Sequence, residues 1–363
     1  MEPIRVLQVV PNMHRAGLET LIMNIYRNID RQKVQFDFLV HYGQRFDYDD
    51  EIERLGGQIY RLTVREDNNF FKYLRDLDRF FSSHPEYKIV HGHMESFGFI
   101  YSHYAKKHSA ETVIAHSHNA FVEPTLKGFM KNMMNRPWKR TATDLFACSE
   151  KAGKFMFGDK PFRVINNGVE TERFAYDAKT RSLLRNEMGL EDKTVIGHVG
   201  RFDPQKNHDF LLEIFSEYLK LDKKAVLLLV GDGPLFDKIM EKAKALGISD
   251  SVRFLGVRSD VDKLYQVFDI LMLPSLFEGL PVVGVEAQCA GLPMLTSDEV
   301  TAEVEITDLV CRFPLSASAD EWAMKISEMI TEERVSHHRE VAEKGYDIKN
   351  TAEFLQQFYI DRT

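Results

Sequence analysis

Short apolar runs alternate with helical stretches along most of the chain, and this alternation constrains the fold more than any other feature. The first run, Ile4 to Val10, is apolar except at Arg5 and Gln8, as expected for a strand buried on both faces of a parallel sheet. Strands and helices that alternate through short loops predict doubly wound parallel sheets. The other expected strands lie near Phe36–Val40, Ile89–His91, Thr112–His116, Asp144–Cys148, Phe162–Asn166, Val195–Val199, Ala225–Val230, Val252–Leu255 and Ile270–Leu273.

This pattern occurs twice, and the two occurrences are separated by an Asn167-Gly168 turn and a polar stretch through Arg181. A chain of 363 residues is also too long for one ordinary domain. We therefore expect an α/β chain with one Rossmann-like domain at 1–170 and a second at 171–345. The tail from Ser318 onward is predicted to be amphipathic helix.

Composition excludes several classes of protein. Hydrophobic and charged fractions of 44% and 28% are those of a soluble globular protein. No apolar run approaches the roughly 20 residues that span a bilayer, and the amino terminus reads as a strand rather than a signal peptide, so a cytoplasmic protein is expected. The three cysteines, Cys148, Cys289 and Cys311, lie far apart without metal-site spacing and are expected to be reduced thiols.

Charge is distributed unevenly between the two halves. Residues 1–166 carry 24 basic and 20 acidic side chains, whereas the remainder carries 23 and 35. The acidic second half argues against nucleic acid as a partner. The mildly basic first half could instead face an anionic surface.

Two carboxylates in one apolar stretch, Glu278 and Glu286, suggest a binding site. The strand at Ile270–Leu273 is followed by a turn at Gly279 and by a short helix that Pro281 is placed to start. Backbone amides of Gly279 and Leu280 would then lie at a helix start, where an anion is favoured. The alternative is that Glu278 only caps the helix and that Glu286 is a solvated residue on its face.

A second loop upstream favours the binding site. The strand Val195–Val199 ends in Gly200, and Arg201 and Lys206 follow before the next helix. Arginine supplies a planar fork of donors that fits phosphate oxygens, and lysine supplies a compact charge. Together they could hold a diphosphate without a metal ion.

These two loops resemble those of retaining glycosyltransferases of family 4 with the GT-B fold, the kind that builds bacterial capsule, exopolysaccharide and O-antigen. The resemblance rests on a Gly-Arg…Lys-Asn loop and a Glu-x7-Glu pair, here Gly200, Arg201, Lys206, Asn207, Glu278 and Glu286. It implies two Rossmann-like domains facing across a cleft, an acceptor-binding one first and a nucleotide-sugar-binding one second. It also implies that the last segment, 346–363, packs back on the first domain.

The resemblance implies a role for each residue of the second domain. Arg201, Lys206 and the two amides would stabilise the charge on the leaving diphosphate, which is the main catalytic task in an oxocarbenium-like transfer. Glu286 would accept from the ribose hydroxyls and Glu278 from hydroxyls of the donor sugar. The family retains the anomeric configuration, with the leaving phosphate acting on the acceptor hydroxyl. By family frequency the donor carries uridine diphosphate.

Neither a metal nor a cofactor is expected. Metal-dependent transferases use an Asp-x-Asp motif after a strand. The three such pairs in this chain stand in polar loop or helix contexts: Asp47 with Asp49, Asp76 with Asp78, and Asp260 with Asp262.

Two further loops of the second domain border the nucleotide in the family. They correspond to the turn that contains Asp232 and to the strand end that contains Arg258, with the base near the latter. We expect Arg258 to contact the nucleotide and regard Asp232 as a weaker candidate.

The first domain offers fewer candidates. Gly17 lies near a helix start and could let backbone amides approach a phosphate, although Ala16 replaces the first glycine of the family's Gly-Gly-x-Glu. Two strands end in histidines, His91 with His93 and His116 with His118. Without accompanying carboxylates or cysteines they are poor metal ligands, and we expect His91 and His116 to be structural. In the family a histidine after this strand lies beside the donor sugar, and His118 matches it better than His116.

Residues 124–140 combine aromatic, methionine and basic side chains with no acidic residue. One interpretation is a cleft-lining helix whose apolar face lies in the core. The other is a surface element on an anionic membrane leaflet, which would suit a lipid-linked acceptor and a protein peripheral to the inner face of the cell membrane.

Two other functions remain compatible with the sequence. A sugar-nucleotide epimerase of similar architecture would convert the donor with no acceptor present. A non-catalytic sugar-nucleotide-binding subunit would bind the nucleotide without turnover.

Overall fold

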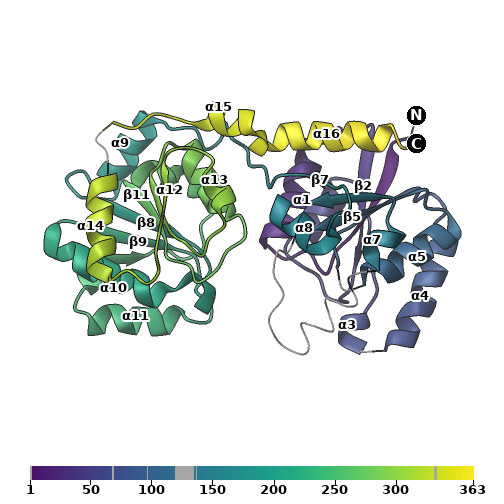
Figure 1. Ribbon diagram of the computed structural model, residues 1–363, viewed down its shortest axis with the longest axis horizontal. Coiled ribbons are helices and arrows are strands. Elements are labelled where there is room, and N and C mark those ends of the chain that lie inside the picture. The colour runs from purple at the N-terminus through teal and green to yellow at the C-terminus, as the bar shows by residue number, and fades with distance from the viewer. Residues whose placement is uncertain (1, 68, 96, 119–134, 136, 331–332) are drawn as a thin grey trace. The chain divides into compact units, whose positions relative to one another are not determined.

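The computed structural model describes residues 2–67, 69–95, 97–118, 135, 137–330 and 333–363. The chain separates into two compact units, each with its own sheet (Figure 1). The first unit is Met1–Gly168 together with Ile348–Thr363, and the second is Val169–Asp347. None of the described helices is long and apolar enough to span a membrane.

The described residues of the first unit form a seven-stranded sheet in the order β3-β2-β1-β4-β5-β6-β7. All neighbouring strands are parallel, and the order reverses between β1 and β4, as in a doubly wound sheet. The strands are β1 (Ile4–Val9), β2 (Val34–Val40), β3 (Ile59–Arg61), β4 (Ile89–Gly92), β5 (Thr112–Ser117), β6 (Asp144–Ala147) and β7 (Arg163–Val164).

The two faces of this sheet bury separate hydrophobic cores, because successive side chains of a strand point to opposite faces. One face packs against α1 (Gly17–Asn28), α2 (Asp49–Arg54) and α16 (Ile348–Ile360). The other packs against α3 (Val64–Asp67), α4 (Phe70–Ser83), α5 (Gly98–His108), α7 (Trp138–Thr141) and α8 (Glu150–Phe157). Figure 1 shows α16 in yellow returning to the purple N-terminal elements, where it packs against α1.

The described residues of the second unit form a six-stranded parallel sheet in the order β10-β9-β8-β11-β12-β13. Here the order reverses between β8 and β11. The strands are β8 (Val195–Val199), β9 (Val226–Val230), β10 (Val252–Phe254), β11 (Ile270–Leu273), β12 (Met294–Ser297) and β13 (Val310–Phe313).

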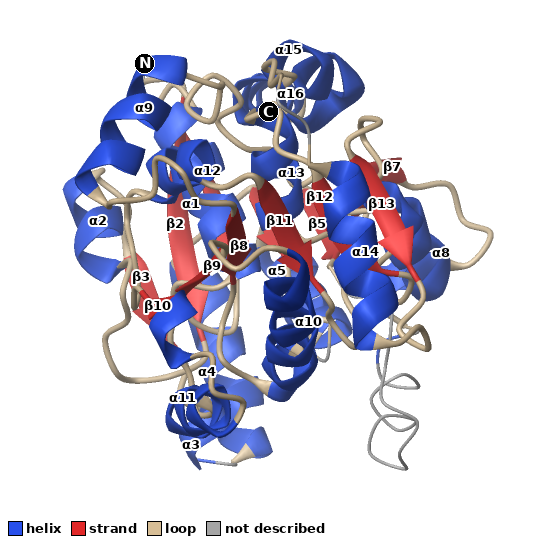
Figure 2. Cartoon of the chain, turned by 90° about the vertical axis from the view of Figure 1, so that its left-hand side faces the viewer, coloured by secondary structure: helices blue, strands red, loops and turns tan. Residues whose placement is uncertain are grey.

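Helices cover both faces of this second sheet (Figure 2). On one face lie α9 (Ala178–Glu187), α12 (Val261–Val267), α13 (Val282–Cys289) and α15 (His338–Val341). On the other lie α10 (His208–Leu221), α11 (Phe236–Ala245) and α14 (Ala319–Met329). Short helical turns complete the unit: η1 (Pro204–Lys206), η2 (Ser249–Ser251), η3 (Ala302–Val304) and η4 (Ala342–Tyr346).

The predicted fold class is confirmed, since both units are α/β with parallel, doubly wound sheets. Some elements were not predicted: β3, β12, β13 and α9, the last of which lies in the polar stretch interpreted as an interdomain crossing. The tail is less continuous than expected. Residues 333–337, between α14 and α15, are not helical, and Gly345 takes a left-handed conformation with φ of 87° just before α16.

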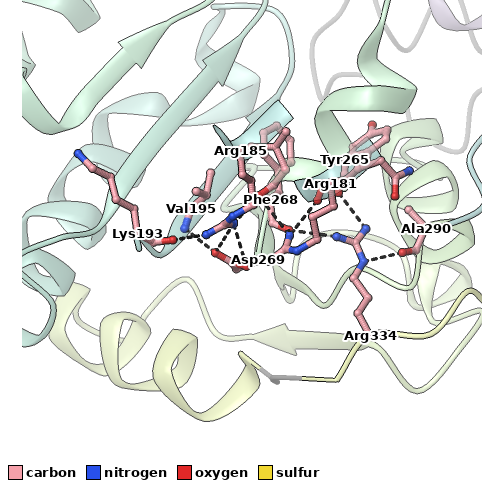
Figure 3. A network of polar contacts seen from close by, with 11 residues as sticks. Arg181, Arg185, Lys193, Val195, Tyr265, Phe268, Asp269, Ala290 and Arg334 are labelled. Atoms are coloured by element: carbon pink, nitrogen blue, oxygen red, sulfur yellow. Dashed lines mark hydrogen bonds and ion pairs between the residues drawn. The ribbon is translucent and has the colours of Figure 1, made fainter. Parts of the chain in front are cut away.

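Three arginines, Arg181, Arg185 and Arg334, form a network of hydrogen bonds at the edge of the second sheet where its strands begin, here called the amino edge (Figure 3). Asp269, just before β11, accepts from Arg181 and Arg185 of α9 and, at 2.7 Å, from the amide of Val195. Arg334 donates to three backbone carbonyls where α12 and α13 end, those of Tyr265, Phe268 and Ala290. Burial lowers the pKa of Arg334 to about 9. The network therefore joins α9 and the segment before α15 to the start of β11.

Candidate functional site

Two loops at the carboxyl edge of the second sheet meet because their strands are neighbours. Ile270 and Leu271 of β11 pair with Ile196 and Gly197 of β8, although the two strands lie far apart in the sequence. The strand order reverses between them, and ligands of such sheets bind outside the carboxyl ends of the strands at this reversal. A ligand site of this unit is therefore expected at two loops, 200–207 after β8 and 274–281 after β11.

Hydrogen bonds hold the two loops together. The amide of Leu276 donates to the carbonyl of Gln205 at 2.8 Å, and the Gln205 side chain donates to the carbonyl of Phe277 at 2.9 Å. Asn207 takes a left-handed conformation with φ of 55°, and its side chain donates to the carbonyl of Pro274 at 3.0 Å. These contacts place Lys206 over the second loop.

Lys206 and Glu278 form an ion pair in which both side chains are largely buried, at 15% and 9% exposure. Ser275 donates to the same Glu278 oxygen at 2.9 Å, and the other oxygen, Oε2, has no hydrogen-bond partner among the described residues. Sequence reasoning assigned the two residues separate roles and missed their pairing. The pair neutralises both charges where little water can do so.

Glycines bring the loops after β8 and β9 into backbone contact. A Cβ atom on Gly231 would lie 2.0 Å from the carbonyl oxygen of Gly200, and its φ of 135° is one that other residues rarely adopt. A Cβ on Gly200 would lie 3.0 Å from His198 Nε2 and 3.2 Å from Lys206 Cε. The close packing around Lys206 therefore depends on both glycines.

Arg201 differs from the other arginines near the sheet. It is exposed, and its guanidinium has neither a hydrogen-bond nor an ion-pair partner among the described residues. The backbone on either side is held in place, because the amide of Phe202 donates to the carbonyl of Asp232 at 2.9 Å. All five donors of Arg201 are therefore available to a ligand at the carboxyl edge.

The start of α13 presents backbone donors at the same edge. Within the part of the chain that the structure describes, the amides of Gly279 and Leu280 have no acceptor. A Cβ on Gly279 would meet nothing within 4 Å, so the space beside it is open. Pro281 precedes the helix as its N-cap instead of occupying its first turn, a shift of one residue from the prediction. Free amides at a helix start favour an anion.

Glu286 lies on the second turn of α13, as predicted, and is half-buried. Its Oε2 accepts from the hydroxyl of Tyr265 on α12 at 2.8 Å. Removal from water raises the pKa of the Glu286 carboxyl to about 7, although the bond from Tyr265 favours the charged form. A carboxyl group that Tyr265 holds through one oxygen is well placed to accept hydrogen bonds from a pair of ligand hydroxyls.

The two weaker candidates of this unit lie in the neighbouring loops. Arg258 is exposed after β10, and both arms of its guanidinium bind Asp260, at 2.8 and 2.7 Å. Asp232 accepts from the amide of Gly233 at 2.7 Å in the turn after β9. Arg258 therefore already has a carboxylate partner, unlike Arg201.

In the first unit, Gly17 begins α1 after the loop that follows β1. A Cβ on Gly17 would meet nothing within 4 Å of it. The approach to this helix start is therefore open despite the methyl group of Ala16, which precedes it as the N-cap.

The histidines at the ends of β4 and β5 form one cluster. His91, His93 and His116 are buried, and His118 is half-buried just after β5. His91 is bonded at both ring nitrogens, but His116 Nε2 is buried with no partner among the described residues, so His116 is less satisfied than expected.

One nitrogen from each of His91, His93 and His116 lies within 4.8 Å of the others, near enough to share a metal ion. His91 Nε2 and His116 Nδ1, however, face each other at 3.1 Å in nearly coplanar rings. Two nitrogens bound to one tetrahedral zinc ion at about 2.0–2.1 Å lie about 3.3 Å apart, so the separation fits an ion, but here the two nitrogens point at each other instead of at a common position. The arrangement found is that of a shared proton.

Most of the basic segment at 124–140 falls outside the described residues. Of its aromatic side chains, Trp138 is described and is fully buried in α7, where a Cβ on Gly98 would lie 2.3 Å from its ring. Trp138 therefore belongs to the core, as the cleft-lining interpretation expects, and is not part of a surface.

Comparison with known proteins gives two family matches that together span nearly the whole chain. Residues 181–347 match the model of glycosyl transferases group 1, and residues 15–173 match that of glycosyltransferase family 4. The chain is 34% identical to a glycosyltransferase named EpsF from Bacillus subtilis, over 98% of this chain and 96% of that protein. It is 23% identical to CapH, a capsular polysaccharide biosynthesis glycosyltransferase of Staphylococcus aureus, over 99% of both chains.

Among solved structures, the chain resembles Anabaena HepE in complex with UDP. The TM-score is 0.81 at 17% identity, covering 98% of this chain and 100% of that one. At this identity the likeness shows the fold alone.

Proposed function

Because the chain belongs to the family 4 glycosyltransferases, with a group 1 domain and the GT-B type of fold, we propose that it transfers a sugar from a uridine diphosphate sugar to a saccharide or lipid-linked saccharide, with retention of configuration. Its relative CapH, a capsular polysaccharide biosynthesis glycosyltransferase, agrees with a task in polysaccharide biosynthesis. Uridine is proposed as the base because it is the most frequent one in the family and because the structure of HepE holds UDP.

The observation that carries the proposal is the set of unmatched donors beside the Lys206–Glu278 pair. Arg201 and the amides of Gly279 and Leu280 have no acceptor among the described residues and share the carboxyl edge of one sheet. A diphosphate supplies the oxygens that they lack. Because negative charge grows on the leaving phosphate, donors placed in advance favour the transition state over the ground state.

The two carboxylates take different parts of the donor. Glu286, positioned by Tyr265, accepts from the two ribose hydroxyls. Glu278 is held by Lys206 and Ser275 through one oxygen, which leaves Oε2 to accept from a hydroxyl of the donor sugar. Binding of the diphosphate draws Lys206 toward the phosphate, and Glu278 then relies more on Ser275 and the sugar.

We also propose that the transfer needs no metal ion. Each Asp-x-Asp pair of the chain is already neutralised by protein cations: Asp49 by Arg61, Asp78 by Lys107, Asp260 by Arg258 and Asp262 by Arg173. A carboxylate that holds an arginine or lysine is a poor site for a hard cation unless that partner moves away. Arg201 and Lys206 supply the positive charge instead.

The acceptor side of the proposal rests on the first unit. His118 contacts the donor sugar or the acceptor hydroxyl, and Gly17 leaves room for a phosphate at the start of α1. Contact of the basic side chains of 124–140, without the buried Trp138, with an anionic membrane would bring the enzyme to a lipid-linked acceptor at the inner face of the membrane.

The test is donor turnover by the purified protein in the presence of EDTA. A panel of UDP-sugars is incubated with and without lipid-linked and free saccharide acceptors, and UDP release and the anomeric coupling of the product are measured. We expect UDP release that depends on an acceptor, and a product with the anomeric configuration of the donor. Conversion of the donor sugar without an acceptor would instead identify an epimerase. Tight UDP binding with no turnover on any acceptor would identify a binding subunit.

A further inference from the structure

Four histidines at the ends of β4 and β5, His91, His93, His116 and His118, lie on one face of the first sheet. Within each His-x-His motif, the two side chains are two positions apart along the strand direction and so point the same way. Gln8 of β1 stands opposite His91 of β4 in the sheet register. This is the face on which α16 packs, and its Tyr359 reaches His91. Elements from three parts of the sequence therefore meet around Gln8.

Two chains of hydrogen bonds start at or beside the Gln8 amide, which is buried. In the first, Gln8 Oε1 bonds His93 Nε2 at 2.9 Å, and His93 Nδ1 bonds His118 Nε2 at 2.9 Å. In the second, the hydroxyl of Tyr359, which borders the same small cavity as Gln8, bonds His91 Nδ1 at 2.7 Å. His91 Nε2 in turn bonds His116 Nδ1 at 3.1 Å.

The imidazoles of both chains are neutral. Burial lowers the pKa of His91, His93 and His116 well below the usual value, and it lowers the pKa of His118 to about 3. A neutral imidazole has one N–H donor and one lone pair, on different nitrogens. Once the role of one nitrogen is known, every later bond in the chain has a fixed direction.

With the Gln8 amide oxygen facing His93, the first chain has one solution. Gln8 Oε1 can only accept, so His93 carries its proton on Nε2 and has a lone pair on Nδ1. That lone pair requires His118 to donate from Nε2. The remaining nitrogen of His118, Nδ1, is left with a lone pair, and it has no hydrogen-bond partner among the described residues.

The second chain is consistent with the same amide orientation. With its oxygen used by His93, the Gln8 amide nitrogen is free to face the hydroxyl of Tyr359, whose own proton goes to His91 Nδ1. His91 donates to His116, which then carries its remaining proton on Nε2. A cavity of about 10 Å³ borders His91, His93 and His116, about the volume one water molecule needs.

We propose that Gln8 and His93 are positioning residues that hold His118 in the Nε2–H tautomer, so that Nδ1 offers a lone pair to a sugar hydroxyl. His118 thus accepts a hydrogen bond from its ligand. Contact of His118 with a sugar rests on the proposed function, whereas the tautomer is a property of the chain alone.

The first experiment is long-range ¹H–¹⁵N NMR on the full chain labelled with ¹⁵N-histidine, without any ligand. It distinguishes the protonated from the unprotonated ring nitrogen, and a His118→Gln variant identifies the His118 signals. We expect His118 to be protonated on Nε2 and unprotonated on Nδ1 at pH 7. The opposite tautomer, or an even mixture, would overturn the proposal without a single assay of transfer.

A pair of variants tests whether Gln8 sets the tautomer of His118. Gln8→Met keeps the volume but removes the acceptor, so the His118 signals should shift to a mixture of tautomers. Tyr359→Phe removes a hydroxyl from the second chain only and should leave His118 on Nε2. An unchanged tautomer in Gln8→Met would remove Gln8 from the proposal. If Gln8→Met fails to fold, the wild-type spectrum and Tyr359→Phe still decide the direction of the chain.

The link to function has a separate readout. With a donor and acceptor that turn over, Gln8→Met should lower kcat by roughly tenfold while KM for the donor changes less. Unchanged kcat together with a mixed tautomer would mean that the network works as described but that the His118 lone pair does not serve the transfer. Absence of turnover in the wild type would refute the proposed function and leave the tautomer result standing.

Discussion

The two edges of the second unit's sheet hold similar side chains in opposite states. At the amino edge, arginines and a carboxylate bind one another and the backbone (Figure 3). At the carboxyl edge, an ion pair between Lys206 and Glu278 lies beside Arg201, which has no partner among the described residues. Residue type is therefore a poor guide to role, and the hydrogen-bond state of each charge is a better one.

The difference follows from what each edge must do. Asp269 accepts from two guanidinium groups and a backbone amide, and Arg334 ends two helices by binding their last carbonyls. Such groups have little bonding capacity left for a ligand, and their loss unpairs buried charges. The carboxyl edge keeps donors that lack a protein acceptor among the described residues and face solvent, so a bound anion can take them without breaking a bond within the protein.

The largest expected effect is on stability at the amino edge. Asp269→Ala should lower the free energy of unfolding by about 3–5 kcal/mol, because Arg181 and Arg185 are left partly buried without their carboxylate. Urea unfolding measures it, with Asp192→Ala as the control, since Asp192 is an exposed aspartate near the same edge. At temperatures where Asp269→Ala is folded, its affinity for UDP should match that of the wild type. Equal free energies of unfolding of Asp269→Ala and Asp192→Ala would contradict a structural role for the carboxylate at the amino edge.

The next effect is on transfer at the carboxyl edge. Arg201→Ala should lower kcat by about 10²–10³-fold, the scale for loss of a donor that stabilises transition-state charge. Because Arg201 is exposed and unpaired among the described residues, its free energy of unfolding should change by less than about 0.5 kcal/mol. Lys223→Ala, an exposed cation just before β9, is the matched control. Full activity of Arg201→Ala would show that its free donors have no ligand.

A smaller effect concerns pH. If only the ionised Glu286 accepts from the ribose, the Kd for UDP should rise about tenfold for each unit of pH below 7. Calorimetric titration from pH 5.5 to 8.5 measures it. The ratio of wild type to Glu286→Gln at each pH removes the titration of the phosphates themselves. A ratio that does not vary with pH would argue against the ribose role.

The same carboxyl has an opposite effect on folding. Its pKa of about 7 lies above that of an unfolded chain, so the folded state binds more protons between the two values. The stability that Glu286 contributes is therefore highest below pH 4.5 and is lost as pH rises toward 7. Glu286→Gln should accordingly gain stability relative to the wild type between pH 5 and pH 8. Thermal unfolding of the wild type and of Glu286→Gln at pH 5 and pH 8 tests the direction of this change in relative stability.

The smallest expected effect is that of Tyr265→Phe. The variant removes the hydroxyl that orients Glu286 at 2.8 Å and leaves the ring in the core. We expect UDP affinity to fall by roughly threefold to tenfold, the value of one hydrogen bond. The pKa of Glu286 should rise, which moves the pH profile of binding upward. An unchanged profile would mean that Tyr265 only fills space.

Much of the fold was predictable because its signals are local. The mainly apolar runs Val195–Val199 and Ile270–Leu273, which were expected to be strands, coincide with β8 and β11. The elements that were not predicted are short or lack such a signal. Strand β3 has three half-buried residues, and α9 is a polar helix held by its arginines on Asp269, a contact made across the sequence.

The sequence by itself determined the class of fold, the loops at the strand ends and the types of side chain that those loops carry. Hydrophobic period, glycine and proline positions and charge are all properties of neighbouring residues. Which distant residues meet was decided only by the tertiary structure. Lys206 binds Glu278 because β8 and β11 are adjacent, and Gln8 directs His93 because β1 and β4 are adjacent. Strand order depends on packing of the whole unit, and no local pattern encodes it.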